Sequence, residues 1–255
     1  MTRKFIPSAI LLSFAIVVLL SSAFPVAGQD IQAMRKLNPR QPAPIDINPE
    51  RVTAAGIQIF AGKHIRLYSD LRDPAKLKEL IAIFDAAAPL WCKYFEIDSA
   101  KTKPWVMSGF AMVDRERFKK AGLLPPEIIK FQSGLHRGHE MWFDLQKDDY
   151  YTRHLMLHEG THAFMQWILG GFGSPWYSEG MAEMLAVHRW ENNRLELNYR
   201  LRDRSESVGW GRIKIIRDEY ADKNAMKLDE VVAIDGALFG SSNRLYAWSL
   251  SLIHI

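Results

Sequence analysis

Apolar residues recur three and four positions apart along several stretches of the chain, and this spacing predicts amphipathic helices. The longest such stretch is residues 73–95, where Asp73 is placed to cap the first turn and Pro74 stands at a position that helices tolerate. Residues 151–169 follow the same period up to a pair of glycines. Further helices are expected over residues 114–124, from Ser174 or Ser178 to Trp190, and over residues 211–222 and 243–255.

Shorter apolar runs bounded by turn residues predict strands, and most of them lie in the first half of the chain. Residues 56–71 have the pattern of two short strands around a Gly-Lys turn. Buried strands are expected within residues 104–113 and 139–146, and residues 194–201 form a strand or an extended arm. Strands followed by helices predict an α+β fold, with a small twisted sheet plus helices and then a mostly helical half.

The N-terminal residues have the pattern of an export signal. A short basic start, an apolar run and small residues are typical of a signal peptide over residues 1–28, cleaved after Ala23 or Gly28. The alternative is an uncleaved anchor over residues 5–24, and only this would give the protein a stable membrane partner. Either interpretation makes the rest of the chain secreted or periplasmic, with the proline-containing residues 29–50 as a linker.

The composition is that of an ordinary globular protein, with 48% hydrophobic and 24% charged residues in 255. Without Arg3 and Lys4 of the signal, 31 basic residues face 29 acidic ones, a net charge of about +2. No basic cluster accompanies this weak charge, so a nucleic-acid partner is not expected. The single cysteine, Cys92, forms no intramolecular disulfide and is expected to be a small buried apolar side chain.

The working domain is expected to span residues 51–255. The chain ends at Ile255, inside an apolar run and without a polar tail. Chains rarely end within a core helix, so we expect this domain to be truncated at its C-terminus.

The stretch RHLMLHEGTHAFMQWILGG, residues 153–171, carries the most specific chemistry. On a helix, His158 and His162 lie on one face about 6 Å apart, and both imidazoles can reach one zinc ion at about 2.1 Å. Glu159 points about 100° away around the axis, where it can serve as a general base. This spacing is typical of metallopeptidases.

His154, four residues before His158, leaves a second pairing open. His154 and His162 are about 12 Å apart along the helix, so no single ion reaches both. The pair is therefore His154 with His158 or His158 with His162, and only the second encloses Glu159. His154 is expected to pack or to support a ligand. Chance histidines on a buried helix are the alternative, so a third ligand is needed.

Two carboxylates in the next predicted helix supply candidates for that ligand. Glu179 and Glu183 are four residues apart in SPWYSEGMAEMLAVHRW, among apolar neighbours, so at least one of them faces the interior and needs a partner. The glycines within residues 170–173 let this helix fold back against the histidine helix. We assign Glu179 to the metal and Glu183 to the support of a ligating histidine.

The segment HEGTH, sixteen residues and then EGMAE resembles the glutamate zincins, metallopeptidases with two His and one Glu on zinc. The overall pattern is most similar to exported bacterial peptidase-MA-like domains, over about residues 60–255. The resemblance implies a zincin-like fold with the metal in the cleft between its two halves. In thermolysin-like members an acid four residues after the ligand supports a histidine, and this position is Glu183 here.

The resemblance also implies a donor for the oxyanion. In aminopeptidase-like zincins a tyrosine that opens a helix takes this role, and Tyr246 stands 67 residues (246 minus 179) after Glu179. An ordinary buried aromatic is the alternative for Tyr246. The glutamate motif that grips a free amine in aminopeptidases is not found, because SGFAM at residues 108–112 contains no acid. The sequence therefore leaves open whether cleavage is internal or terminal.

Together these residues predict zinc-dependent hydrolysis of peptide bonds in a peptide or protein substrate. His158, His162 and Glu179 hold Zn²⁺, and Glu159 takes a proton from the attacking water. The strand expected within residues 139–146 is the candidate edge for pairing with the substrate backbone. The alternative is an exported, non-catalytic binding domain with a structural or vestigial zinc site.

Overall fold

The computed structural model describes residues 44–128, 130–199 and 211–254, which form an α+β fold. The predicted signal peptide and most of the predicted linker lie outside these residues. Helix α2 (Pro49–Ala54) begins slightly earlier than the expected start of the domain. Within the described ranges, no helix combines the length and the apolar character needed to span a membrane.

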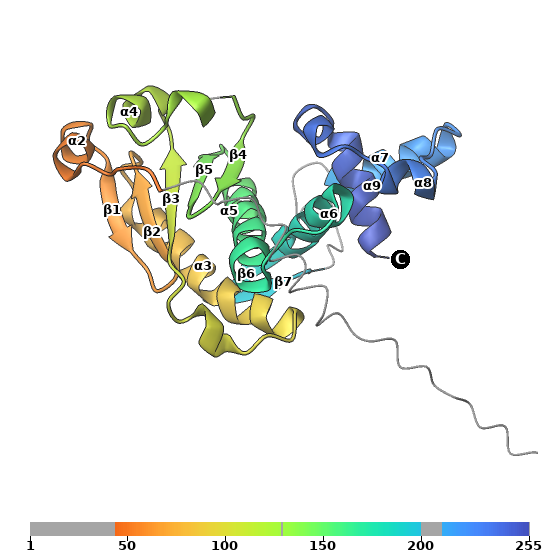
Figure 1. The fold of residues 1–255 in the computed structure, drawn as a ribbon, viewed down its shortest axis with the longest axis horizontal. Helices are drawn as coiled ribbons and strands as arrows, with labels where there is room; N and C mark the ends of the chain where they lie inside the picture. Colours follow the sequence, from red (N-terminus) through yellow and green to blue (C-terminus); the bar gives the residue numbers. More distant parts are fainter. Residues whose placement is uncertain (1–43, 129, 200–210, 255) are drawn as a thin grey trace, which may run out of the picture.

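A five-stranded mixed sheet forms the first half of the molecule (Figure 1). Its order is β1-β2-β3-β5-β4; the inner pairs β2-β3 and β3-β5 are parallel, and both edge pairs are antiparallel. The strands are β1 (Gln58–Ala61), β2 (Ile65–Ser69), β3 (Met107–Met112), β4 (Gly134–Arg137) and β5 (Glu140–Asp144).

Two features of this sheet correct the sequence prediction. Strand β4 was not expected, and it occupies the edge next to β5. The strand predicted within residues 139–146 is β5, which pairs with β3 on one side and β4 on the other. Its backbone is therefore used within the sheet, and the prediction that it pairs with substrate is wrong. The predicted pair of strands within residues 56–71 is confirmed as β1 and β2.

Alternate residues of the inner strands enter two separate cores, as the two-residue period of a strand requires. On one face Leu67 and Phe143 pack with helix α3 (Pro74–Tyr94) and helix α5 (Asp149–Phe164). On the other face Phe110 and Trp142 pack with α2 and helix α4 (Arg115–Lys120). The short 3₁₀ helices η1 (Ser99–Thr102) and η2 (Pro126–Ile128) lie in the connections.

The helices of this half follow the sequence pattern with small changes. Asp73 caps α3 by accepting hydrogen bonds from the N–H groups of Ala75 and Lys76, as expected. Cys92 is buried in the core, also as expected. The helix predicted over residues 114–124 ends early, at Lys120, and the chain continues as a loop. The carbonyl of Leu123 in this loop accepts a hydrogen bond from the indole of Trp142.

Helix α5 connects the two halves. It continues as one π-helical turn, η3 (Met165–Leu169), and ends at Gly170, which has a left-handed φ of 88°. The chain then reverses, and helix α6 (Pro175–Ala186) packs back against α5 (Figure 1). The prediction that these glycines fold one helix onto the other is confirmed.

The second half is mostly helical but contains a two-stranded ribbon. Helix α6 ends at Ala186 and not at the predicted Trp190, because the residues that follow form a hairpin. Its turn, Asn192 and Asn193, has positive φ angles of 52° and 58°, which asparagine tolerates. The elements are β6 (His188–Glu191), β7 (Arg194–Leu197), α7 (Gly211–Ala221), α8 (Leu228–Val232), η6 (Gly236–Ser241) and α9 (Asn243–Ile253).

Candidate metal centre

Helix α5 presents both predicted histidines to the same point. The Nε2 atoms of His158 and His162 lie 3.2 Å apart, and their rings meet almost edge to face, with an interplanar angle of 77°. Both side chains are buried, as is the neighbouring Glu159. Two imidazole nitrogens so close in a buried site are unfavourable unless a proton or a cation lies between them.

Helix α6 brings Glu179 to that point. Its Oε2 atom is 3.3 Å from Nε2 of His158 and 3.4 Å from Nε2 of His162. This oxygen is buried and accepts no hydrogen bond from any described residue. Burial alone would raise the pKa of Glu179, but the imidazoles of His162 and His158 hold it well below its usual range. The carboxylate of Glu179 therefore favours its ionised form, with one oxygen facing the two imidazole nitrogens.

The spacing of these three atoms fits a zinc ion. A tetrahedral ion with bonds of about 2.1 Å has its ligand atoms about 3.4 Å apart. The three separations here are 3.2, 3.3 and 3.4 Å. Two imidazoles and one carboxylate are also a donor set that leaves a fourth position open, as catalytic zinc sites do. Of the residues present, His158, His162 and Glu179 could hold such an ion.

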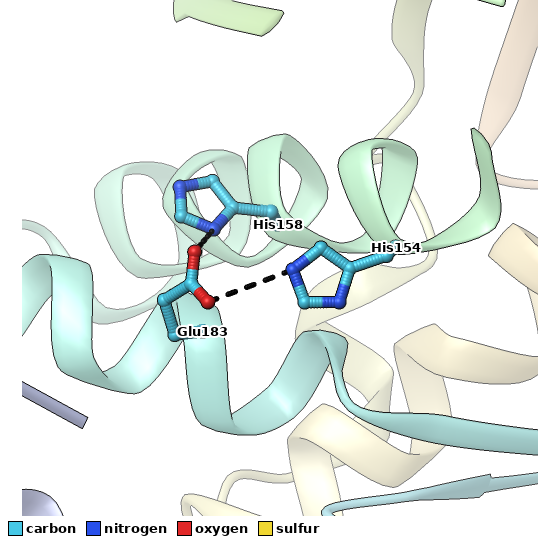
Figure 2. Close-up of side chains that lie close together, drawn as sticks. All are labelled: His154, His158 and Glu183. Atoms are coloured by element: carbon cyan, nitrogen blue, oxygen red, sulfur yellow. Dashed lines mark ion pairs between the residues drawn. The ribbon is translucent and has the colours of Figure 1, made fainter. Parts of the chain in front are cut away.

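A second group, His154, His158 and Glu183, also lies close together (Figure 2). Here Glu183 stands between two rings, with Oε1 at 3.5 Å from Nδ1 of His158 and Oε2 at 3.7 Å from Nε2 of His154. Both of its oxygens accept hydrogen bonds from Arg212, at 2.8 and 3.0 Å. A metal ion there would sit beside a guanidinium, so the pairing of His158 with His162 is the one that suits a metal.

The remaining nitrogens of the two histidines also have polar partners. Nδ1 of His158 faces Glu183, and Nδ1 of His162 lies 3.1 Å from the hydroxyl of Ser178. Such partners fix the orientation of a ligating imidazole. Glu183 therefore stands where the sequence assigned it. Ser178 was missed, although its place directly before Glu179 in the sequence was a usable signal.

Glu159, next to His158 on α5, lies against strand β4. The backbone of His136 on this strand favours the ionised carboxylate of Glu159 and so lowers its pKa. A methyl group at Gly134 would overlap Oε1 of Glu159, so the absence of a side chain there makes room for the carboxylate. Burial raises the pKa of Glu159 to about 8, against the opposing effect of His162. A carboxyl group that titrates near neutrality is suited to exchange a proton.

Tyr246 lies beside the group on helix α9. Its ring centroid is 6.0 Å from that of His158 and 5.1 Å from that of Phe239. Burial raises the pKa of Tyr246 well above its usual range, so the phenol keeps its proton and remains a donor. The ring thus packs in a small apolar cluster and also faces the candidate metal centre.

Helix α9 comes this close because Gly180 has no side chain. A Cβ at Gly180 would be 2.7 Å from the backbone oxygen of Ser249 and 2.6 Å from the side chain of Ile253. The glycine of the EGMAE segment therefore lets α6 and α9 touch backbone to backbone. This contact positions Tyr246, one turn before Ser249, near His158.

The group opens into a cleft of about 1830 Å³. Strand β4 lines one side, and residues of α7 and α9 line another. His158, Glu159, His162 and Glu179 are all part of its wall. The cleft therefore lies between the sheet half and the helical half.

No protein-family model matches the chain, and a search of curated proteins found no similar sequence. The resemblance to glutamate zincins consequently stays a hypothesis carried by the residues themselves. Any functional conclusion must come from the geometry of the site.

Proposed function

We propose that this protein is a zinc-dependent peptidase with a zincin-like arrangement of its two halves. The observation that carries the proposal is the convergence of two imidazole nitrogens and one carboxylate oxygen, each 3.2–3.4 Å from the other two. His158, His162 and Glu179 would hold the ion. Bound there, zinc supplies a Lewis acid that polarises a carbonyl and lowers the pKa of water.

Glu159 is the general base in this proposal. Glu159 is not one of the three residues that converge on the candidate ion. A purely structural metal site would have no need of it. The space at Gly134 lets its carboxylate lie at the wall of the cleft. The ionised carboxylate would accept a proton from the attacking water and return it to a leaving amine. Tyr246 is the proposed donor to the oxyanion.

A peptide is the substrate that the cleft suits best. The cleft volume of about 1830 Å³ exceeds the roughly 300–1,000 Å³ typical of small-molecule sites. Strand β4 replaces β5 as the candidate edge for pairing with an extended chain. The carbonyl oxygen of Ser133 accepts a hydrogen bond from the N–H of Asp144, the last residue of β5. Along an antiparallel pair, only every second residue turns its backbone N–H and C=O groups towards the partner strand. The backbone groups of Gly134 and His136 therefore face away from β5, towards the cleft.

Zinc content and hydrolysis of a casein-type substrate test the proposal together. Wild-type protein is expected to bind one zinc ion and to cleave the substrate. Glu159→Gln keeps the size of the side chain and leaves the three proposed ligands in place, so it should retain zinc and lose about 10²- to 10⁴-fold in rate. His162→Ala should lose zinc as well. A Glu159→Gln variant that cleaves as fast as wild type contradicts the assignment of the base.

A non-catalytic binding domain is the outcome if the folded chain binds no metal and cleaves nothing. Export of the domain stays a prediction from residues 1–28, which lie outside the described part of the chain.

A further inference from the structure

Arg212, the second residue of helix α7, contacts several side chains near the candidate metal centre, although the proposed mechanism gives it no role. Its Nε and Nη2 atoms donate to the two oxygens of Glu183 at 3.0 and 2.8 Å, a two-pronged ion pair. Its Nη1 donates to Oδ1 of Asn243 at 2.6 Å. The guanidinium carbon also lies 4.8 Å from the ring centroid of Tyr246.

These contacts place Arg212 behind Glu183, the residue that faces the proposed metal ligand His158. Glu183 is buried, and its Oε1 faces Nδ1 of His158 at 3.5 Å. The guanidinium fixes the plane of the carboxylate, and the carboxylate in turn fixes the ring of His158. Removing the guanidinium would leave a buried carboxylate without its counter-charge, which is strongly unfavourable. The orientation of His158 therefore depends on a residue that touches no metal ligand itself.

Helix α7 reaches this position together with helix α9. Glu219 of α7 accepts hydrogen bonds from Arg244 at 2.7 Å and from the indole of Trp248 at 2.8 Å, both on α9. These bonds join α7 and α9 without Arg212, which adds a bond to Asn243 of α9. Arg212 also links α7 to Glu183 on α6. Loss of its side chain should thus leave α7 on α9, and α9 on α6 at Gly180, but detach α7 from Glu183.

We propose that Arg212 is a positioning residue that couples metal binding at His158 to the docking of helix α7. This inference rests on the proposed metal centre and concerns the regulation of metal binding at that same site. Coupling of two binding events is reciprocal. If docked α7 orients His158 for the metal, then bound metal favours docked α7. Helix α7 then closes over the cleft more tightly when the ion is present.

Zinc affinity, measured by competition with a chromophoric chelator, is the first test. Arg212→Ala should weaken zinc binding about 10- to 100-fold, the usual effect of losing a group behind a metal ligand. Arg212→Lys keeps a charge but not the two-pronged bond, and an intermediate loss is expected. Lys214→Ala is the control, because Lys214 is on the same helix and its ion pair is with Asp218 of that helix. It should bind zinc as wild type does.

The pathway through Glu183 is tested by a double-mutant cycle. If Arg212 acts through Glu183, then Glu183→Gln and the double variant with Arg212→Ala should weaken zinc binding to similar extents. The double variant also buries no unpaired charge, so it keeps the test open if Arg212→Ala alone folds poorly. Additive losses from the two changes would overturn this pathway.

Hydrogen exchange distinguishes coupling from a merely structural role. A merely structural residue would not change the effect of zinc on amide exchange. In wild type, zinc should slow amide exchange in residues 211–221. In Arg212→Ala this zinc-dependent part should vanish, and residues 211–221 should exchange at least as fast as in metal-free wild type. Equal zinc affinity and equal zinc-dependent protection in both proteins would overturn the coupling and leave the proposed function standing. A wild-type protein that binds no zinc would overturn both.

Discussion

The two sides of the candidate metal centre are built on different principles. On the sheet side, Glu159 lies in the space that Gly134 leaves on strand β4. On the helical side, Glu183 is held by the charge and shape of the Arg212 side chain. A backbone strand offers one fixed position for a general base. A side-chain ion pair between helices can form or break, so this side can respond to the metal.

Tyr246→Phe tests the helical side with the largest effect expected in this comparison. This substitution keeps the ring that packs against Phe239 but removes the hydroxyl donor. If the phenol stabilises the oxyanion, kcat should fall about 10²- to 10³-fold with little change in zinc affinity. Steady-state kinetics on a peptide substrate measure this, with Tyr220→Phe, an exposed tyrosine of α7, as the matched control. Unchanged kcat would make Tyr246 an ordinary packing residue.

Gly134→Ala tests the sheet side. The added methyl group overlaps Oε1 of Glu159, a flexible group that can move aside, so the fold should tolerate the change. Displacing the base by about 1 Å should lower kcat on the order of 10²-fold, and zinc binding should stay the same. Arg137→Ala on the same strand removes only an ion pair with Glu127 and serves as the control. Full activity in Gly134→Ala would mean that the position of Glu159 does not depend on β4.

Gly180→Ala applies the same change to the helical side, where the neighbour is rigid. The new Cβ meets the backbone of Ser249, which cannot rotate away as a carboxylate can. Unfolding free energy should fall by about 1–3 kcal/mol, measured by chemical denaturation. Ser249→Ala is a useful counterpart, because it removes a buried hydroxyl that has no hydrogen-bond partner among the described residues and should cost little. A stable Gly180→Ala protein would show that α9 can move without loss.

The residues that the sequence made predictable are those whose partners are close along a helix. His158, Glu159 and His162 share a local period, so their arrangement on α5 followed from helix geometry alone. Glu179 was within reach because glycines between the helices signalled a reversal. The β1–β2 pair was also local, with a two-strand pattern around one turn.

The parts that escaped prediction depend on contacts between distant segments. Strand β4 has the sequence GLHR, without the alternation that marks a half-buried strand, and its neighbours decide its place. Because β4 was not predicted, β5 was wrongly taken for the edge strand of the sheet. Arg212 meets Glu183 across 29 positions of sequence, and no short-range pattern announces the pair. The early end of α6 did have a signal in Asn192 and Asn193, which favour a hairpin turn.

The pH dependence of stability separates the buried general base from the rest of the site. The folded pKa of Glu159 is raised to about 8 from an ordinary 4.5. Between these values the folded protein binds more protons at Glu159 than the unfolded chain does. The stability that this group contributes is complete below pH 4.5 and is lost as the pH rises through 8.

In metal-free protein, the unfolding free energy of wild type should therefore fall relative to that of Glu159→Gln, by at most about 1.4 kcal/mol per pH unit. Denaturant titrations with a chelator at pH 5, 6.5 and 8 measure the difference. Glu179 and Glu183 are present in both proteins, so their own titrations largely cancel. Parallel stability curves for the two proteins would mean that Glu159 is ionised in the folded state without penalty, and that strand β4 offers it a more polar site than its burial implies.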